Sequence, residues 1–129
     1  PGGRDVSRYA DYLHGQVEEL LTRYAPVDTM WFDFSYPDRR DAAGRPLAGG
    51  KGRADWRSEE LIALVRRLAP GALINDRLDV DGAADFVTPE QYQPAAPVVI
   101  DGVPVTWEAC QTLNGSWGYH RDNLDWKSP

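Results

Sequence analysis

The sequence has few of the residues on which covalent cross-links and metal sites depend. Among its 129 residues there are two histidines and one cysteine, Cys110. A single cysteine excludes an internal disulfide and any zinc site built from several cysteines. The sequence also lacks an apolar run of the roughly 20 residues that a helix needs to cross a bilayer, so we expect no membrane partner.

Basic residues are outnumbered as well: 14 lysines and arginines stand against 20 aspartates and glutamates, and the net charge is -6. Nucleic-acid surfaces depend on clustered lysine and arginine, and we therefore expect no nucleic-acid partner. The remaining composition, 42% hydrophobic and 26% charged, is ordinary for a soluble globular protein. The length corresponds to one domain or to part of a larger one.

The first half of the sequence alternates between helical and strand patterns. Apolar residues at three- and four-residue steps predict an amphipathic helix over residues 5–24. The apolar and aromatic run at residues 28–34 predicts a strand buried on both faces. After an irregular segment at residues 35–54, a second helix is predicted over residues 55–68, with its first residue as N-cap. Residues 72–74 then form a short buried strand, which completes a parallel strand–helix–strand unit.

The second half is less regular. Residues 85–88 are a possible short strand, and residues 98–103 have the pattern of a small hairpin. Residues 105–110 predict a further strand. A glycine-interrupted aromatic loop follows at residues 114–119. The sequence contains five tryptophans and six tyrosines in all, whose flat rings suit stacking on sugars but serve equally well as core residues.

Acidic side chains recur at the downstream ends of the predicted strands, where parallel barrels and sheets gather their functional residues. They are accompanied in sequence by an arginine and by tryptophans: Asp33, Asp76 with Arg77, Glu90, Glu108, Trp31, Trp107 and Trp117. Paired carboxylates with aromatic neighbours suit glycoside cleavage, which requires one ionised and one protonated acid. Acids at strand ends also bind divalent metals, and others only cap helices. From the residues alone, sugar hydrolysis, metal-assisted hydrolysis and a structural role all remain open.

A set of short motifs narrows these alternatives. They occur in this order along the chain: Trp31-Phe32-Asp33, Asn75-Asp76-Arg77, Thr88-Pro89-Glu90, Trp107-Glu108-Ala109-Cys110 and Ser116-Trp117-Gly118-Tyr119. Together they resemble the catalytic domain of the retaining α-L-fucosidases, a glycoside hydrolase family with a lysosomal member and many bacterial ones. Each motif is weak alone, but the likeness runs in register from about residue 9 to residue 126.

The resemblance implies roles for three acidic residues. Asp33 is similar in position to the family's nucleophile, which forms a covalent fucosyl-enzyme. Glu90, in Thr-Pro-Glu, aligns with the general acid/base of several members. Because the family's acid/base lies at differing spacings from the nucleophile, Glu108 is the alternative acid/base. In a retaining enzyme the two carboxyl groups stand about 5–5.5 Å apart.

Three further residues are implied to bind the sugar. Trp31 matches a residue whose side chain helps to bind it, and Arg77 matches an arginine that contacts fucose near the nucleophile. Trp117 falls where the family places an aromatic ring beneath the methyl-bearing face of fucose. The implied substrate is a fucosylated oligosaccharide or glycoconjugate, and neither a cofactor nor a metal is required.

The resemblance also implies an α/β fold, a (β/α)₈ TIM-type barrel. Such a barrel has typically about 250 residues, so residues 1–129 are expected to be a fragment of the catalytic domain with about half of the barrel. An incomplete barrel has unpaired strand edges, and the fragment alone is expected to be inactive. A non-catalytic carbohydrate-binding domain and a metal-dependent hydrolase on a similar barrel are the alternatives. The family suits a secreted, periplasmic or lysosomal protein and indicates no oligomeric state or fucosyl linkage.

Overall fold

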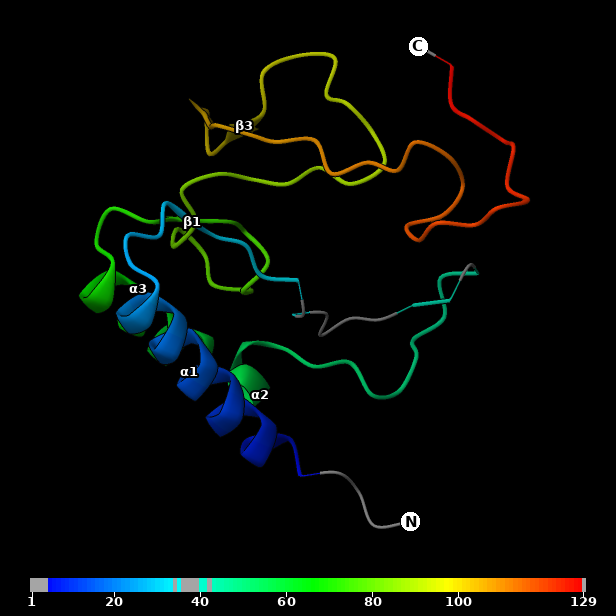
Figure 1. Cartoon of the computed structure of the whole chain (residues 1–129). Helices are drawn as coiled ribbons and strands as arrows, with labels where there is room; N and C mark the ends of the chain where they lie inside the picture. The colour runs from blue at the N-terminus through cyan, green and yellow to red at the C-terminus, as the bar shows by residue number, and fades with distance from the viewer. Residues whose placement is uncertain (1–4, 34, 36–39, 42, 129) are drawn as a thin grey trace. The chain divides into compact units, whose positions relative to one another are not determined.

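The computed structural model describes residues 5–33, 35, 40–41 and 43–128 of the chain (Figure 1). The chain forms two compact units, Pro1–Phe86 and Val87–Pro129. Among the described residues, no helix is both long enough and apolar enough to cross a membrane. The elements in chain order are α1 (Val6–Arg23), β1 (Thr29–Met30), α2 (Arg53–Trp56), α3 (Ser58–Leu68), β2 (Leu73–Ile74), β3 (Val99–Ile100) and β4 (Val103–Pro104).

Helix α1 forms where the apolar spacing predicts it. Its N-terminus is capped by Asp5, whose carboxylate accepts a hydrogen bond from Ser7 N–H at 3.0 Å. Val17 and Leu21 are buried in the core of the first unit. Arg23 lies in the last turn, where a positive charge is favourable. The helix predicted over residues 5–24 is confirmed.

The second predicted helix is two helices. Arg57 separates α2 from α3 and has a left-handed backbone, with φ 52° and ψ 52°. Asp55, the predicted N-cap, lies instead in the first turn of α2, where its carboxylate accepts a hydrogen bond from Gly52 N–H at 3.1 Å. The predicted start at residue 55 is therefore wrong. Neither glycine nor proline marks the break, and these are the residues by which a sequence signals one.

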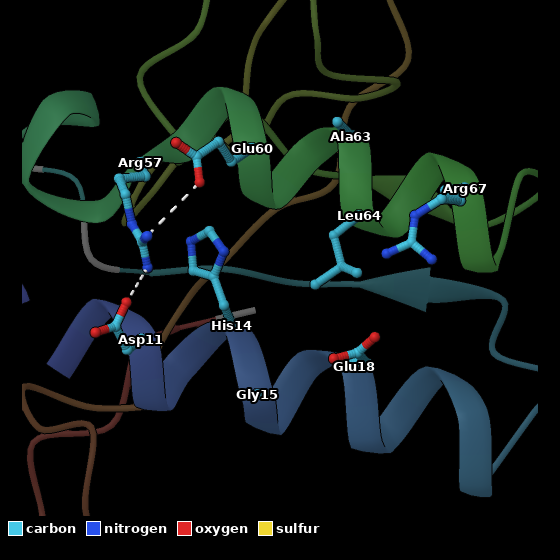
Figure 2. A pocket seen from close by; sticks show the side chains of 9 residues that line it. All are labelled: Asp11, His14, Gly15, Glu18, Arg57, Glu60, Ala63, Leu64 and Arg67. Carbon is cyan, nitrogen blue, oxygen red and sulfur yellow. Dashed lines mark hydrogen bonds and ion pairs between the residues drawn. The ribbon is translucent and has the colours of Figure 1, made fainter. Parts of the chain in front are cut away.

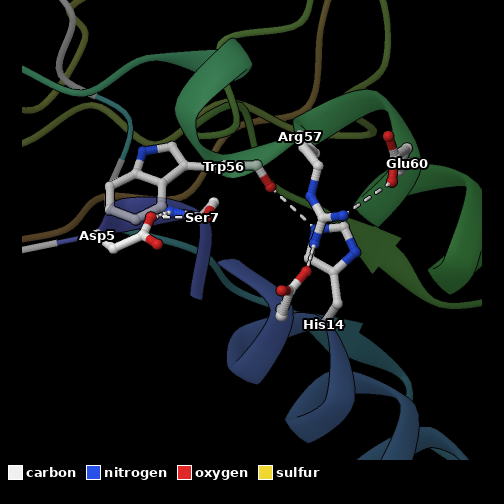
Figure 3. A network of polar contacts seen from close by, with 7 residues as sticks. Asp5, Ser7, His14, Trp56, Arg57 and Glu60 are labelled. Atoms are coloured by element: carbon white, nitrogen blue, oxygen red, sulfur yellow. Dashed lines mark hydrogen bonds and ion pairs between the residues drawn. The ribbon is translucent and has the colours of Figure 1, made fainter. Parts of the chain in front are cut away.

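Contacts with α1 stabilise this break (Figure 3). His14 Nε2 donates a hydrogen bond to the carbonyl oxygen of Trp56, the last residue of α2, at 2.9 Å. The Arg57 guanidinium pairs with Asp11 at 2.6 Å and with Glu60 at 3.7 Å. A left-handed residue other than glycine costs about 1–2 kcal/mol, and these contacts offset that cost. His14 is thus a helix-packing histidine.

A groove of about 620 Å³ runs between α1 and α3 (Figure 2). Side chains of both helices project into it. Its lining includes three carboxylates, two guanidinium groups and one imidazole. The residues that line it are Asp11, His14, Gly15, Glu18, Arg57, Glu60, Ala63, Leu64 and Arg67.

Strands β1 and β2 pair in parallel, with Thr29 beside Leu73 and Met30 beside Ile74. The chain between them includes α2 and α3. Parallel neighbours need such a crossover connection, because a tight turn can only join antiparallel strands. The strand–helix–strand unit predicted from the sequence is confirmed.

One face of this strand pair packs on the helices and the other does not. Phe32 and Ile74 are 4% and 1% exposed, whereas Trp31 and Leu73 are 37% and 49% exposed. The strand predicted over residues 28–34 is wrong in length, because β1 covers only Thr29–Met30. It is also wrong in being buried on both faces, because the helices cover one face only. Residue 34 lies outside the described residues. The core consists of Val17, Leu21, Phe32, Leu61, Val65, Ala72, Ile74 and Leu78.

The chain beyond β2 returns and pairs in parallel with the end of β2, on which it forms a second neighbour besides β1. Asn75 pairs with Phe86, and Asp85 N–H donates to the Ile74 carbonyl oxygen at 2.8 Å. Residues 75–85 are all described and form turns and bends without a helix. The first unit is thus a small mixed α/β structure, and the described residues form no closed barrel.

The second unit contains the predicted hairpin. β3 and β4 pair in antiparallel fashion on either side of Asp101 and Gly102. These two residues have φ values of 50° and 81°, which the favoured two-residue hairpin turns require. The hairpin predicted over residues 98–103 is confirmed.

Two other segments of the second unit, residues 87–91 and 106–110, run in parallel. Glu108 N–H donates to the Val87 carbonyl oxygen, and Cys110 N–H donates to that of Pro89, both at 2.9 Å. The next hydrogen bond of a parallel ladder would run from the N–H of residue 89 to the Glu108 carbonyl oxygen, and Pro89 has no N–H to donate. The strands predicted over residues 85–88 and 105–110 are therefore present as paired segments rather than as continuous strands.

Asp85 gives the first unit a pH-dependent contribution to stability. Its carboxylate accepts hydrogen bonds from Ile74 N–H at 2.7 Å and from Arg66 at 2.6 Å. Burial, the largest influence, raises the pKa of Asp85. The hydrogen bonds from Arg66 and Ile74 and the charge of Arg66 outweigh it and lower the pKa below the ordinary 3.8. This stabilisation is present above pH 3.8 and is lost as the pH falls through the lowered pKa.

We expect Asp85→Asn to lower the free energy of unfolding by about 1 kcal/mol or less near pH 7, because the ion pair is partly exposed. Asparagine keeps an acceptor for Ile74 N–H but loses the charge. Denaturant unfolding of the full-length protein at a series of pH values measures the difference, with the exposed Asp81→Asn as control. The difference should shrink as the pH falls below 3.8, and a difference that stays constant in acid would contradict the assignment.

Candidate functional site

Asp33 and Arg77 form an ion pair just beyond the ends of the two parallel strands. Asp33 follows β1 and Arg77 follows β2, and Arg77 Nη1 lies 2.6 Å from Asp33 Oδ1. The Arg77 side chain is 11% exposed, whereas that of Asp33 is 49% exposed. The guanidinium is thus held within the unit, beside a carboxylate that solvent can reach. The sequence-based expectation that these residues lie together is met.

Trp31 completes this group. The guanidinium carbon of Arg77 lies 4.9 Å from the centroid of the Trp31 ring, within the range of a cation–π contact. Trp31 and Asp33 are both exposed, and the residue between them, Phe32, is buried. We call these three residues the Asp33–Arg77–Trp31 cluster. It presents a carboxylate, a cation and an aromatic ring at one edge of the first unit.

Asn75 holds the backbone of Phe32, between Trp31 and Asp33, in a contact that the sequence did not reveal. Its side-chain oxygen accepts a hydrogen bond from Phe32 N–H at 2.9 Å, and its side-chain nitrogen donates to the Phe32 carbonyl oxygen at 2.8 Å. Asn75 is 1% exposed. In the sequence, Asn75 is part of the Asn75-Asp76-Arg77 motif after a predicted buried strand, but that pattern does not identify its partner 43 residues away.

In the second unit, Glu90 and Glu108 lie on neighbouring segments. Glu90 pairs with Cys110, and Val87 pairs with Trp107. Side chains alternate between faces along extended chains, so this register puts Glu90 and Glu108 on the same face. Both residues are exposed. The two candidate acid/base residues are therefore neighbours.

Trp117 lies on a loop that is tied to the segment of Glu90. The loop closes where Asn114 pairs with Trp126. Gln91, the residue after Glu90, accepts hydrogen bonds from Lys127 Nζ at 2.7 Å and from Thr112 Oγ1 at 3.1 Å. Gln91 was not singled out in the sequence, because these partners lie 21 and 36 residues further along the chain.

The loop encloses a pocket of about 450 Å³. Trp117 is 61% exposed on its wall. An exposed aromatic ring beside a pocket of this size can stack on a ring-shaped ligand. The pocket is lined by Gln111, Thr112, Leu113, Asn114, Ser116, Trp117, Gly118, Tyr119, His120, Arg121, Asn123 and Trp126.

The described residues offer two sets of groups for acid–base and nucleophilic chemistry. The first unit holds an exposed carboxylate beside a guanidinium, an arrangement that suits a nucleophile or a stabiliser of positive charge. The second unit holds two exposed glutamates, the residue type that serves as general acid or base. In the described part of the chain, no group of three or more histidine, cysteine, aspartate or glutamate side chains is placed to hold a metal ion.

The chain is similar to known proteins along nearly its whole length. A family model described as alpha-L-fucosidase matches residues 2–129. The structure of alpha-L-fucosidase isoenzyme 1 from Paenibacillus thiaminolyticus is 41% identical with a TM-score of 0.78, over 98% of this chain and 29% of that one. No curated protein matches the chain.

Two other solved structures extend the comparison. A bacterial fucosidase with a pyrrolidine–triazole inhibitor is 28% identical with a TM-score of 0.67, over 90% of this chain and 27% of that one. A mutant of the alpha-L-fucosidase AlfC from Lactobacillus casei, in complex with 4-nitrophenyl α-L-fucopyranoside, is 26% identical with a TM-score of 0.56, over 89% and 29%. The chain thus spans less than a third of the length of these structures.

Proposed function

The chain belongs to the α-L-fucosidase family, and on that basis we propose that the full-length protein releases α-L-fucose from fucosylated oligosaccharides or glycoconjugates. The observation that carries this proposal is the 2.6 Å ion pair between Asp33 and Arg77 at the strand ends, with the Trp31 ring beside it. An exposed, ionised carboxylate of this kind suits attack on a sugar's anomeric carbon.

The reaction is a double displacement in which Asp33 is the nucleophile. The Asp33 carboxylate attacks the anomeric carbon while Glu90 gives its proton to the departing glycosidic oxygen, and a fucosyl ester of Asp33 forms. Glu90, now ionised, takes a proton from water as the water oxygen attacks the same carbon. The bond to Asp33 breaks, and fucose leaves with its configuration retained. Glu108 is the alternative acid/base.

The remaining site residues bind the sugar. Arg77 keeps Asp33 ionised and contacts fucose beside it, and Trp31 adds an aromatic wall. Trp117 lies beneath the methyl-bearing face of fucose. The exposure of the Trp31 and Trp117 rings supports these roles.

Residues 1–129 form about half of a (β/α)₈ catalytic barrel. Successive segments that pair in parallel support this assignment: β1 with β2, Asn75 with Phe86, and Val87 with Trp107. Consecutive parallel strands are the building pattern of such barrels. The isolated fragment is expected to be inactive, because an incomplete barrel has unpaired strand edges.

The test is to follow hydrolysis of 4-nitrophenyl α-L-fucoside by the full-length protein, with proton NMR to identify the anomer that forms first. We expect rapid release of nitrophenol and α-L-fucose as the first product. β-L-fucose as the first product would contradict the retaining mechanism. Fucose binding without hydrolysis would favour a carbohydrate-binding domain instead, and loss of activity with a chelator would favour a metal-dependent hydrolase.

A further inference from the structure

We infer that Asn75 is a positioning residue for this reaction, because its side-chain amide fixes the backbone that carries Trp31 and Asp33. This inference rests on the proposed function, since it assigns Asn75 a part in the attack by Asp33. Asn75 itself need not contact the sugar. Its contribution is to the placement of the nucleophile.

The side chain of Asn75 holds both peptide groups that flank Phe32. Its oxygen accepts from Phe32 N–H, which belongs to the peptide shared with Trp31, at 2.9 Å. Its nitrogen donates to the Phe32 carbonyl oxygen, which belongs to the peptide shared with Asp33, at 2.8 Å. This pairing fixes the orientation of the Asn75 amide. If the amide were flipped, its NH₂ group would face the Phe32 N–H and its oxygen would face the Phe32 carbonyl oxygen.

The Asn75 side chain binds the chain just beyond the last backbone-paired residues of β1 and β2. β1 ends at Met30 and β2 ends at Ile74, and the last pair of their register is Met30 with Ile74. Asn75 is the next residue after β2, and its amide continues the pairing to the segment that holds the nucleophile. The Phe32 ring is buried in the core. The backbone before Asp33 is thus fixed both by the Asn75 amide and by the burial of Phe32, while the carboxylate remains exposed.

Solvent cannot replace these hydrogen bonds. Asn75 is 1% exposed and Phe32 is 4% exposed, and a truncated side chain would remove two hydrogen bonds from a buried peptide backbone, which is costly. The Phe32 backbone would then move to reach other partners. Asp33 would keep its ion pair with Arg77, but its direction of approach to the anomeric carbon would change.

The experiment compares Asn75→Ala with Ile74→Val in the full-length protein. Ile74 is equally buried and precedes Asn75 in the chain, and its side chain makes no hydrogen bond. We expect Asn75→Ala to lower kcat per folded enzyme by about 10²-fold with KM nearly unchanged, the effect of a nucleophile misplaced by about 1 Å. Ile74→Val should leave both constants nearly unchanged. Circular dichroism gives the folded fraction for each protein.

A second variant and a second measurement separate positioning from stability. Asn75→Asp keeps the shape of the side chain, and in its protonated form it can accept from Phe32 N–H and donate to the Phe32 carbonyl oxygen. Its kcat relative to wild type, corrected for folded fraction, should therefore rise as the pH falls. Hydrogen exchange should show a less protected Phe32 amide in Asn75→Ala and an unchanged one in Ile74→Val.

The outcomes distinguish this inference from the function on which it rests. A wild-type protein without fucosidase activity would contradict the proposed function. With an active wild type, unchanged kcat in Asn75→Ala would overturn the positioning role alone. So would an unchanged Phe32 amide, or a rise in KM at constant kcat.

Discussion

Asp33→Gly should lower the kcat of the full-length protein on an aryl α-L-fucoside by on the order of 10⁴–10⁶-fold, as loss of a covalent nucleophile does in other hydrolases. No other side chain of the Asp33–Arg77–Trp31 cluster can form an ester with the sugar. The substitution also removes one ion-pair partner of Arg77, whose side chain is 11% exposed. Binding is therefore expected to change as well, but far less than kcat.

Azide gives this experiment its sharpest readout. Glycine leaves a space where the carboxylate stood, and a small anion that enters it lies close to the Arg77 guanidinium. We expect azide to restore part of the turnover in Asp33→Gly and to give a fucosyl azide of inverted configuration, because a single displacement then replaces two. The matched control is Asp28→Gly, an exposed aspartate just before β1. Full activity in Asp33→Gly would end the assignment of the nucleophile.

The second large effect is expected for Glu90→Gln. A positioned general acid contributes typically about 10²–10⁴-fold, and glutamine cannot give a proton to the departing oxygen. The loss should be largest for natural fucosides, whose leaving groups are poor. It should be much smaller for a nitrophenyl fucoside, because nitrophenolate leaves without protonation. Kinetics on the two substrate classes measure the contrast.

Glu108→Gln is the matched control for Glu90→Gln. The two glutamates are exposed and lie on the same face of neighbouring segments, so both substitutions remove one charge from similar surroundings. We expect Glu108→Gln to show no dependence on the leaving group. If Glu108→Gln shows that dependence and Glu90→Gln does not, the acid/base assignment passes to Glu108.

The sequence predicts those elements whose signals are local. α1 has a capping aspartate and apolar residues at helical spacing, and both are readable within a single turn. The hairpin of β3 and β4 has an Asp-Gly turn. The break at Arg57 has no such signal, because it depends on His14 and Asp11 from another helix. The local sequence favours one continuous helix there, but tertiary contacts with α1 stabilise the break.

The same limit applies to the candidate site. Strand order predicted that Asp33 and Arg77 meet, because both follow parallel strands that end at one edge. It did not predict that Asn75 holds the Phe32 backbone, since this contact joins a side chain to a peptide group rather than one motif to another. The interruption of the strands predicted over residues 85–88 and 105–110 was missed for a similar reason. Pro89 lacks an N–H and so removes one hydrogen bond from the parallel pairing of residues 87–91 with residues 106–110, whose sequences otherwise have a strand pattern.

The contacts described for the Asp33–Arg77–Trp31 cluster join residues 31–77, all within the first unit. Ribosomes extend a chain from its N-terminus, and units fold in that order, so we expect the surroundings of Asp33 to become ordered before the second unit does. We therefore expect insertions after residue 86 to leave the contacts of this cluster intact.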